Sequence, residues 1–190
     1  MYRGEVASKN TKLITASFTS GLLEAALDEN VNIVNAEIMA KDRGIEITES
    51  SSSEVGDFST LIQATIETEH GHPTAAGTVF GKQFLRLVRL GTFTLDAYLD
   101  GLMLIFRHRD VPGLIGFIGT MFGQHGVNIA HMSLGRENDV QGGNAVAVLN
   151  LDNPPTPEVV AEIRAHPEVT SVELVKLPPA GAPLPWLDRG

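Results

Sequence analysis

Cysteine is absent from this 190-residue sequence. Without thiols there can be no disulfide, no cysteine-ligated zinc or iron–sulfur centre and no cysteine nucleophile. A chain without disulfides fits the cytoplasm, which is the compartment that we expect. The opening residues, MYRGEVASKN, contain no apolar h-region, so we expect no signal peptide.

Basic residues are also scarce. The 14 lysines and arginines face 23 aspartates and glutamates, which gives a net charge of −9 at pH 7. Nucleic acids and anionic membranes are bound through basic surfaces, so neither is an expected partner. The longest apolar runs are about half a dozen residues, against the roughly 20 of a membrane-spanning helix. Because 43% of the residues are hydrophobic, we expect a soluble, acidic protein with real cores.

Catalytic signatures are missing as well. No G-x-G-x-x-G follows a predicted strand, and there is no P-loop or G-x-S-x-G. His70 and His72 form a close pair, but no third ligand is near them in sequence, so we interpret them as a solvated turn. The serines 50–53 are likewise interpreted as a loop. The sequence therefore predicts no catalytic residue and no metal site.

Residues 1–100 are expected to form a first small domain. Thr19 or Ser20 is expected to cap a helix over 22–29, and Gly44 to end a second helix over 31–44. The predicted apolar face of that second helix consists of Ile33, Val34, Ile38 and Met39. Strands are predicted at 2–7, 44–48, 58–68, 74–81 and 84–90, and in the last of these Arg86 and Arg89 lie opposite the apolar side chains.

Residues 101–177 predict a second domain with a cleaner pattern. Strands are expected at 102–107, 127–136, 145–151 and 169–177, and helices at 112–125 and 157–166. This order is the ferredoxin-like βαββαβ arrangement. The fold class is therefore α/β (α+β), with two small domains. The proline-rich tail 178–190 is expected to be extended or disordered.

The helix predicted over 112–125 contains three glycines on one stripe, Gly116, Gly119 and Gly123. Each costs roughly 1 kcal/mol in helix propensity relative to alanine. A close backbone approach would compensate for that cost. The backbone that approaches the glycines belongs either to the rest of the same domain or to a second chain. A contact with a second chain is the more specific hypothesis.

A polar turn, RHRD, leads into this helix. Asp110 can take an ammonium group, the free N–H groups near Gly113 and Leu114 a carboxylate, and His108 a hydroxyl. Asp110 can equally act as a helix cap. Asn128 lies at the other end of the helix, roughly 20 Å away. A two-fold dimer would bring Asn128 of one chain to Asp110 of the other and so form two identical amino-acid sites.

The stretch RHRDVPGLIGFIGTMFGQHGVNIAHMSLGRE, followed by GGNAVAVLNLD, resembles an ACT domain, a βαββαβ module that senses small molecules. The segments YRGEVA, GLLEAALDENVNIVNAEIMAKDRGIEITES and AAGTVFGKQFLRLVRL resemble the intervening, allosteric substrate-binding domain of the D-3-phosphoglycerate dehydrogenase family. Together the two resemblances cover residues 2–177. They imply the regulatory region of such an enzyme, without the NAD-binding catalytic domains that precede it in the family.

The resemblance implies an effector, L-serine or a similar small amino acid, bound between two ACT domains of a dimer or tetramer. The implied effector-binding residues are His108, Asp110, Gly113 and Leu114 from one chain and Asn128 from the other. Many relatives have asparagine in place of Asp110. NAD is expected only in the full-length parent protein, and no cofactor is expected in this chain.

In some relatives the intervening domain binds an anion through basic residues, and Lys82, Arg86 and Arg89 are the nearest candidates here. Three alternatives stay open. One is the β subunit of an iron–sulfur L-serine dehydratase, although the Gly-Pro-Ser-Ser-Ser-His motif of that protein is missing. The others are a free-standing amino-acid sensor and an ACT dimerisation module without a ligand.

Overall fold

The computed structural model describes residues 1–24, 26–27, 30–81, 83–138 and 140–178. Its described residues divide into two units, residues 1–63 and residues 64–178. Lys82 and the predicted tail beyond Pro178 lie outside the described residues. Among the described residues, no helix is both long enough and apolar enough to span a lipid bilayer.

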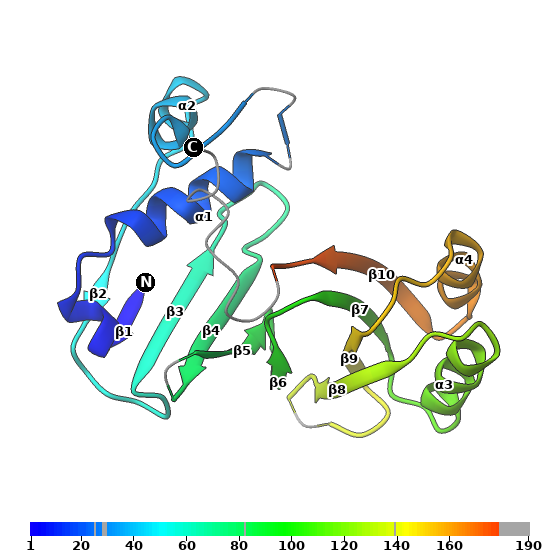
Figure 1. The fold of residues 1–190 in the computed structure, drawn as a ribbon. Coiled ribbons are helices and arrows are strands. Elements are labelled where there is room, and N and C mark those ends of the chain that lie inside the picture. The colour runs from blue at the N-terminus through cyan, green and yellow to red at the C-terminus, as the bar shows by residue number, and fades with distance from the viewer. Residues whose placement is uncertain (25, 28–29, 82, 139, 179–190) are drawn as a thin grey trace. The chain divides into compact units, whose positions relative to one another are not determined.

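The first unit combines helices with short strands (Figure 1). In chain order its elements are β1 (Tyr2–Gly4), the 3₁₀ helix η1 (Glu5–Ser8), α1 (Lys12–Glu24), α2 (Ala36–Asp42), β2 (Ser51–Ser52) and β3 (Thr60–Thr65). β1 lies between β2, to which it is parallel, and β3, to which it is antiparallel. The buried Tyr2 joins this sheet to α1, because its hydroxyl lies 2.6 Å from Oγ1 of Thr15.

The first predicted helix starts in the wrong place. Thr19 and Ser20 lie inside α1 rather than at its start, and Asn10 accepts the hydrogen bond from the N–H of Lys12 instead. Serine and threonine can occur inside a helix when their hydroxyls bond the carbonyl four residues back. Ser17 bonds the carbonyl of Leu13 in this way, and Thr19 that of Thr15. The last predicted residues, 28 and 29, lie outside the described residues.

The second predicted helix is shorter and has a different buried face. α2 packs through Ala36 and Ala40, both fully buried, whereas Val34 and Ile38 are 82% and 64% exposed. The small alanines allow a close approach to Leu23 of α1. The strand predicted at 44–48 is not formed, and these residues are exposed and irregular.

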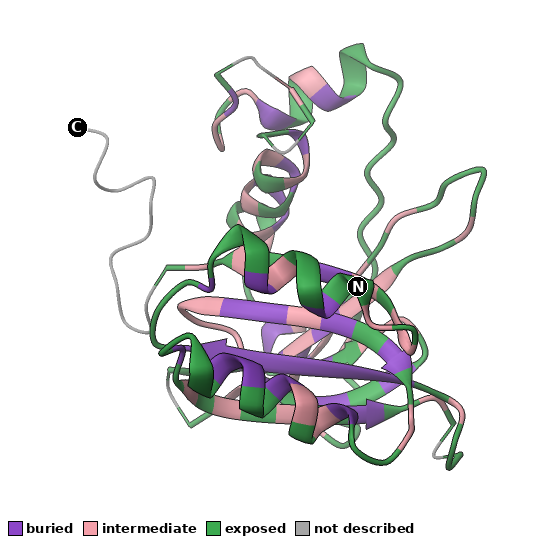
Figure 2. Ribbon diagram, turned by 90° about the vertical axis from the view of Figure 1, so that its right-hand side faces the viewer, coloured by how far each residue is buried: buried purple, intermediate pink, exposed green. Residues whose placement is uncertain are grey.

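The second unit contains strands β4 (Thr74–Phe80), β5 (Phe84–Leu90), β6 (Phe93–Tyr98), β7 (Leu102–Arg109), β8 (Ile129–Arg136), β9 (Asn144–Leu151) and β10 (Val169–Lys176), and helices α3 (Leu114–Gln124) and α4 (Pro157–Ala165). Residues 102–176 form the predicted βαββαβ order, with an antiparallel sheet in the order β10-β7-β9-β8. Both helices lie across one face of this sheet (Figure 2). Phe106 of β7 and Phe122 of α3 are central to the core that they share.

The opposite face of the same sheet is covered by a second layer, the consecutive antiparallel strands β4, β5 and β6. Leu87, Phe93 and Leu95 from this layer pack with Met103 and Val148 from the sheet. β6 was not predicted from the sequence. Strands β4, β5 and β6 therefore share a core with the βαββαβ module.

The alternation predicted for β5 fails in its first half, whereas Leu87 is buried and Arg89 is exposed, as predicted. Phe84 and Leu85 are exposed, and Arg86 is buried. The guanidinium of Arg86 lies 3.5 Å from the ring centroid of Tyr98, and its Nε lies 3.1 Å from the Asp96 carboxylate. A cation–π contact and an ion pair together offset the cost of burying an arginine.

Candidate functional site

Three residues form a row across the sheet of the second unit, at the end where α3 begins. His108 on β7 is paired with Ala145 on β9, and Ala145 is paired with Arg136 on β8. Side chains two residues apart on a strand share a face. Phe106 and Ala147, two residues from His108 and Ala145, belong to the core under the helices, so this row faces the helix side.

His108 is buried, with 4% of its surface exposed. Its Nδ1 lies 2.7 Å from the carbonyl oxygen of Arg109, and its ring packs against Phe106. A neutral ring that donates through Nδ1 leaves Nε2 as an acceptor. Nε2 is buried and has no hydrogen-bond partner among the described residues. Buried polar atoms are nearly always satisfied, so this atom indicates a missing hydrogen-bond donor.

Asp110 follows β7 and forms an ion pair with Arg136, whose Nε lies 2.8 Å from Oδ2 of the carboxylate. The same oxygen accepts a hydrogen bond from the N–H of Gly142 at 3.3 Å. Within the described part of the chain, α3 has Gly113 as its N-cap and no side-chain cap. The alternative reading of Asp110 as the cap of this helix is therefore wrong.

Gly113 and Leu114 form the start of α3, as the sequence predicts. Gly113 has a left-handed backbone, with φ at +92°, which glycine adopts without strain. Leu114 is buried in the core, so its side chain is not available to a ligand. Helix N-termini attract anions because their first N–H groups lack partners within the helix.

Asn128 lies beyond the other end of α3, where its Nδ2 donates to Asp152 at 2.5 Å. Its backbone N–H donates to the Asn153 side chain at 3.4 Å. One chain therefore brings His108 and Asp110 to the same end of the sheet but leaves Asn128 at the opposite end of the helix.

A second polar network borders the site and was not predicted. The carboxylate of Glu137 accepts hydrogen bonds from Asn144 at 2.8 Å and from Thr92 at 2.9 Å. These two bonds hold the pKa of Glu137 below its ordinary value, the Asn144 bond having the larger effect. Asn144 also accepts a hydrogen bond from Arg109 at 3.2 Å. The turn between β5 and β6 is thus bonded to the hairpin between β8 and β9. The only sequence signal was the polar segment between the strands predicted at 127–136 and 145–151.

The three residues predicted for an anion site differ in their surroundings. Arg86 is occupied by Asp96 and Tyr98, Arg89 is exposed on the same strand, and Lys82 is outside the described residues. His72 pairs with Glu67 at 2.5 Å on the surface. Among the described residues, no group of three metal-ligating side chains comes together.

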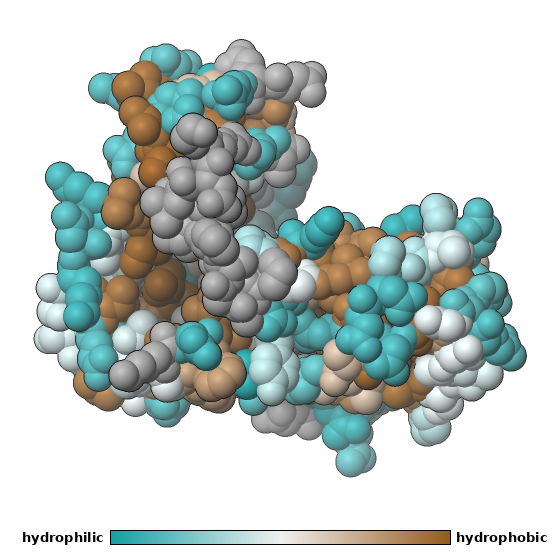
Figure 3. Space-filling view, viewed as in Figure 1, coloured by the Kyte–Doolittle hydropathy of each residue, from teal (hydrophilic) through white to brown (hydrophobic). Residues whose placement is uncertain are grey.

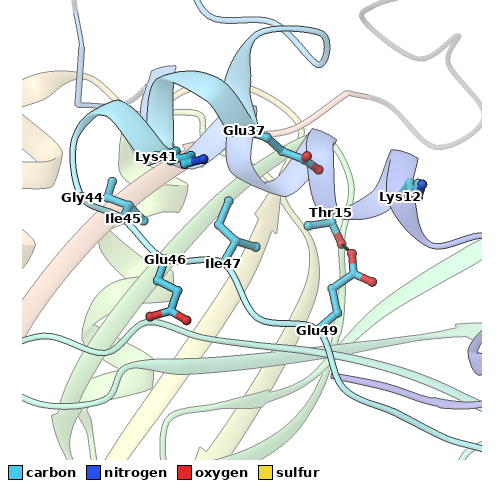
Figure 4. Close-up of a pocket in the computed structure, with 9 residues that line it drawn as sticks. All are labelled: Lys12, Thr15, Glu37, Lys41, Gly44, Ile45, Glu46, Ile47 and Glu49. Atoms are coloured by element: carbon cyan, nitrogen blue, oxygen red, sulfur yellow. Dashed lines mark hydrogen bonds between the residues drawn. The ribbon is translucent and has the colours of Figure 1, made fainter.

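The first unit contains a shallow cavity of about 700 Å³ that the sequence analysis did not predict (Figure 4). Glu49 reaches across it to α1, where it accepts hydrogen bonds from Thr15 and Thr11. The other lining residues are Lys12, Glu37, Lys41, Gly44, Ile45, Glu46 and Ile47. Apolar side chains are also exposed on this unit, as Figure 3 shows in brown. The mixed charges indicate no single class of ligand.

The glycine stripe of α3 is exposed. A Cβ atom added to Gly116, Gly119 or Gly123 would meet no described atom within 4 Å. Close packing inside the domain therefore does not explain these glycines. Met132 and Leu134 of the edge strand β8 are also exposed, and their alternation places them on the helix side of the sheet. Together, these residues leave an uncovered surface of small and apolar groups.

The βαββαβ order and the helix-covered antiparallel sheet define a domain of the ferredoxin-like class. Within this class, residues 102–168 match the ACT domain model. Residues 1–91 match the D-3-phosphoglycerate dehydrogenase intervening domain. The chain therefore belongs to the D-3-phosphoglycerate dehydrogenase family, of which it represents the regulatory region made of the intervening and ACT domains.

Similar proteins carry the same description. The chain is 35% identical over 174 residues to a D-3-phosphoglycerate dehydrogenase of Archaeoglobus fulgidus. The aligned region covers 92% of this chain and 33% of that protein. It is 33% identical to the D-3-phosphoglycerate dehydrogenases of Bacillus subtilis and Methanocaldococcus jannaschii. In both cases the aligned region covers 93% of this chain and 33% of the relative. The chain thus spans about a third of the length of these relatives.

Proposed function

We propose that this chain senses a small amino acid, L-serine or a close analogue, at its ACT domain and regulates a D-3-phosphoglycerate dehydrogenase. The buried, unpartnered Nε2 of His108 is the observation that carries the proposal, because it can accept a hydrogen bond from a donor such as the serine hydroxyl. Asp110 takes the ammonium group, and the N–H groups near Gly113 and Leu114 take the carboxylate.

The site is completed by a second copy of the chain. The exposed Met132 and Leu134 and the glycine stripe of α3 support an ACT dimer, or a tetramer built from it. Antiparallel pairing of two β8 strands about their midpoint brings Asn128 of one copy to Arg136 of the other, beside Asp110. Two equivalent sites per dimer follow from the two-fold symmetry.

Catalysis belongs to the parts of the longer relatives that this chain does not include. Dehydrogenation with NAD is the activity proposed for the full-length protein, in the cytoplasm. The link from β7 to α3, residues 110–113 (DVPG), is not the glycine-rich phosphate loop of NAD-binding domains. Domain limits of 1–100 and 101–177 are part of the proposal, as is an anion at Lys82, Arg86 and Arg89 of the intervening domain.

Calorimetric titration of the 190-residue protein with L-serine tests the proposal, on material of known oligomeric state. D-serine and inorganic phosphate are the comparison ligands. We expect saturable, stereoselective binding at about one site per chain. A well-folded dimer that binds neither enantiomer would overturn the sensor function and favour the second candidate, an ACT dimerisation module. The uncovered glycine stripe is the observation that supports this second candidate.

Two substitutions separate the contributions of the two chains. Asp110→Ala removes the partner of the ammonium group, and we expect affinity for L-serine to fall at least about ten-fold. Asn128→Ala has a comparable effect only if the site is shared, because within one chain Asn128 is remote from Asp110. Circular dichroism of both variants confirms the fold. Unchanged affinity in Asp110→Ala would refute the ammonium assignment.

A further inference from the structure

Arg136 and Asp110 use only part of their hydrogen-bonding capacity in their ion pair. The contact joins Nε of Arg136 to Oδ2 of Asp110. Among the described residues, Nη1 and Nη2 of Arg136 and Oδ1 of Asp110 have no partner. The Arg136 side chain is 46% exposed and that of Asp110 is 24% exposed. A guanidinium end and a carboxylate oxygen therefore stay available side by side.

Arg136 and His108 flank Ala145 in one cross-strand row. Ala145 is buried and places only a methyl group between them. Side chains directly opposite on neighbouring strands have Cβ atoms about 5 Å apart. The two polar residues are thus separated by two strand spacings, with only a methyl group between them.

We propose that Arg136 binds the carboxylate of the effector and so determines that the ACT site takes a zwitterionic amino acid. This inference rests on the proposed function. Nη1 and Nη2 form two parallel hydrogen bonds to the ligand carboxylate, the geometry that the planar guanidinium favours. The carboxylate oxygens have further lone pairs, which accept hydrogen bonds from the N–H groups near Gly113 and Leu114. Oδ1 of Asp110 receives the ligand ammonium group. The Arg136–Asp110 pair stays intact. The ligand lies beside it, with its carboxylate at Arg136 and its ammonium group at Asp110.

This arrangement explains why an acidic residue is compatible with position 110. A lone carboxylate would repel the ligand carboxylate, because like charges a few ångströms apart are unfavourable. Arg136 compensates that charge while leaving one oxygen of Asp110 accessible. A ligand without a carboxylate, or without an ammonium group, leaves one half of the pair unused.

The test is calorimetric titration of the 190-residue protein with L-serine and with L-serinamide, whose amide replaces the carboxylate. Arg136→Gln removes the guanidinium group and its charge. Arg136→Lys keeps the positive charge but lacks the two parallel N–H donors of the guanidinium. The matched control is Arg107→Gln, which makes the same charge change on strand β7 of the same sheet, at an exposed position on the other face. Thermal unfolding followed by circular dichroism confirms that each variant is folded.

We expect the unsubstituted protein to bind L-serine more tightly than L-serinamide. Arg136→Gln should reduce that preference at least ten-fold, mainly by lowering the affinity for L-serine. Arg136→Lys gives an intermediate loss, and Arg107→Gln gives none. If Arg136→Gln keeps the preference, Arg136 is not the carboxylate ligand, although the sensor function stands. If the original protein binds neither compound, both this inference and the proposed function fail. If Arg136→Gln does not fold, Arg136→Lys decides between the first two outcomes.

Discussion

Individual side chains of this protein are defined by neighbours that are distant in sequence. Arg86 was expected on the polar side of its strand, yet it is buried because Tyr98 and Asp96 lie opposite it on β6. Asp110 was a candidate helix cap, yet it pairs with Arg136, 26 residues later in the chain. The residue types could be read from the sequence, but their partners could not, because each partner is on another strand.

Glu137 provides a prediction about pH. Hydrogen bonds from Asn144 and Thr92 lower its pKa below the ordinary value of 4.5. A group with a depressed pKa in the folded state stabilises the fold above its unfolded pKa, and that contribution disappears as the pH falls through the folded pKa. We therefore expect Glu137→Gln to lower the melting temperature slightly at pH 7.

The difference between the two proteins should vanish as the pH falls through the lowered pKa of Glu137, where its carboxylate becomes protonated. Thermal unfolding across this range is the measurement. Glu173→Gln is a suitable control, because Glu173 is an exposed residue of β10 on the same sheet. A difference of constant size at every pH would show that charge on Glu137 is irrelevant to stability.

At the scale of elements, the second half of the chain was predicted far better than the first. The strands and helices of the βαββαβ module agree with the structure to within a few residues. Their periodicity is strong, and turn residues separate them. In the first unit, α1 begins ten residues earlier than predicted, at Lys12, because hydroxyl groups within it bond their own helix. The strand predicted at 44–48 fails because an alternating pattern alone does not supply a partner strand.

The glycines of α3 carry a prediction with two opposite effects. A Cβ at position 119 meets no described atom, so Gly119→Ala should stabilise the folded monomer by roughly 1 kcal/mol through helix propensity. The same methyl group should weaken the proposed dimer if α3 lies at its interface. Thermal unfolding at low concentration and sedimentation equilibrium measure the two effects separately.

Gly126→Ala is the contrasting variant, because φ at this residue is +66° and alanine is strained there. It should destabilise the monomer, whatever its effect on assembly. If Gly119→Ala leaves the dimer as strong as before, the stripe is not part of the interface, and the exposed side chains of β8 become the better candidates.

The boundary between the two matched family models does not coincide with the boundary between the hydrophobic cores. The family models meet between residues 91 and 102, whereas strands β4, β5 and β6 share a core with the ACT sheet. Met103 and Val148 are almost completely buried on that side. An isolated ACT segment would expose them.

A chain of residues 64–178 is therefore expected to unfold cooperatively, because both cores of the second unit lie within it. A chain of residues 101–178 should be less stable by several kcal/mol, since it loses the apolar contacts of Leu87, Phe93 and Leu95. Urea denaturation of the two chains measures the difference, and dye binding reports the exposed apolar face. Equal stability would mean that the β4–β6 layer contributes little to this sheet.

The sequence by itself determined the fold class, the βαββαβ order and the family, because these depend on periodicity, turn residues and motifs that are local in the chain. It also placed His108, Asp110, Gly113 and Leu114 at one end of a helix and Asn128 at the other. Only the tertiary structure decided that Arg136 lies beside Asp110, that Arg86 is buried, and that a second layer of strands covers the ACT sheet. These features depend on strand register and on packing between distant segments, and a one-dimensional pattern carries neither.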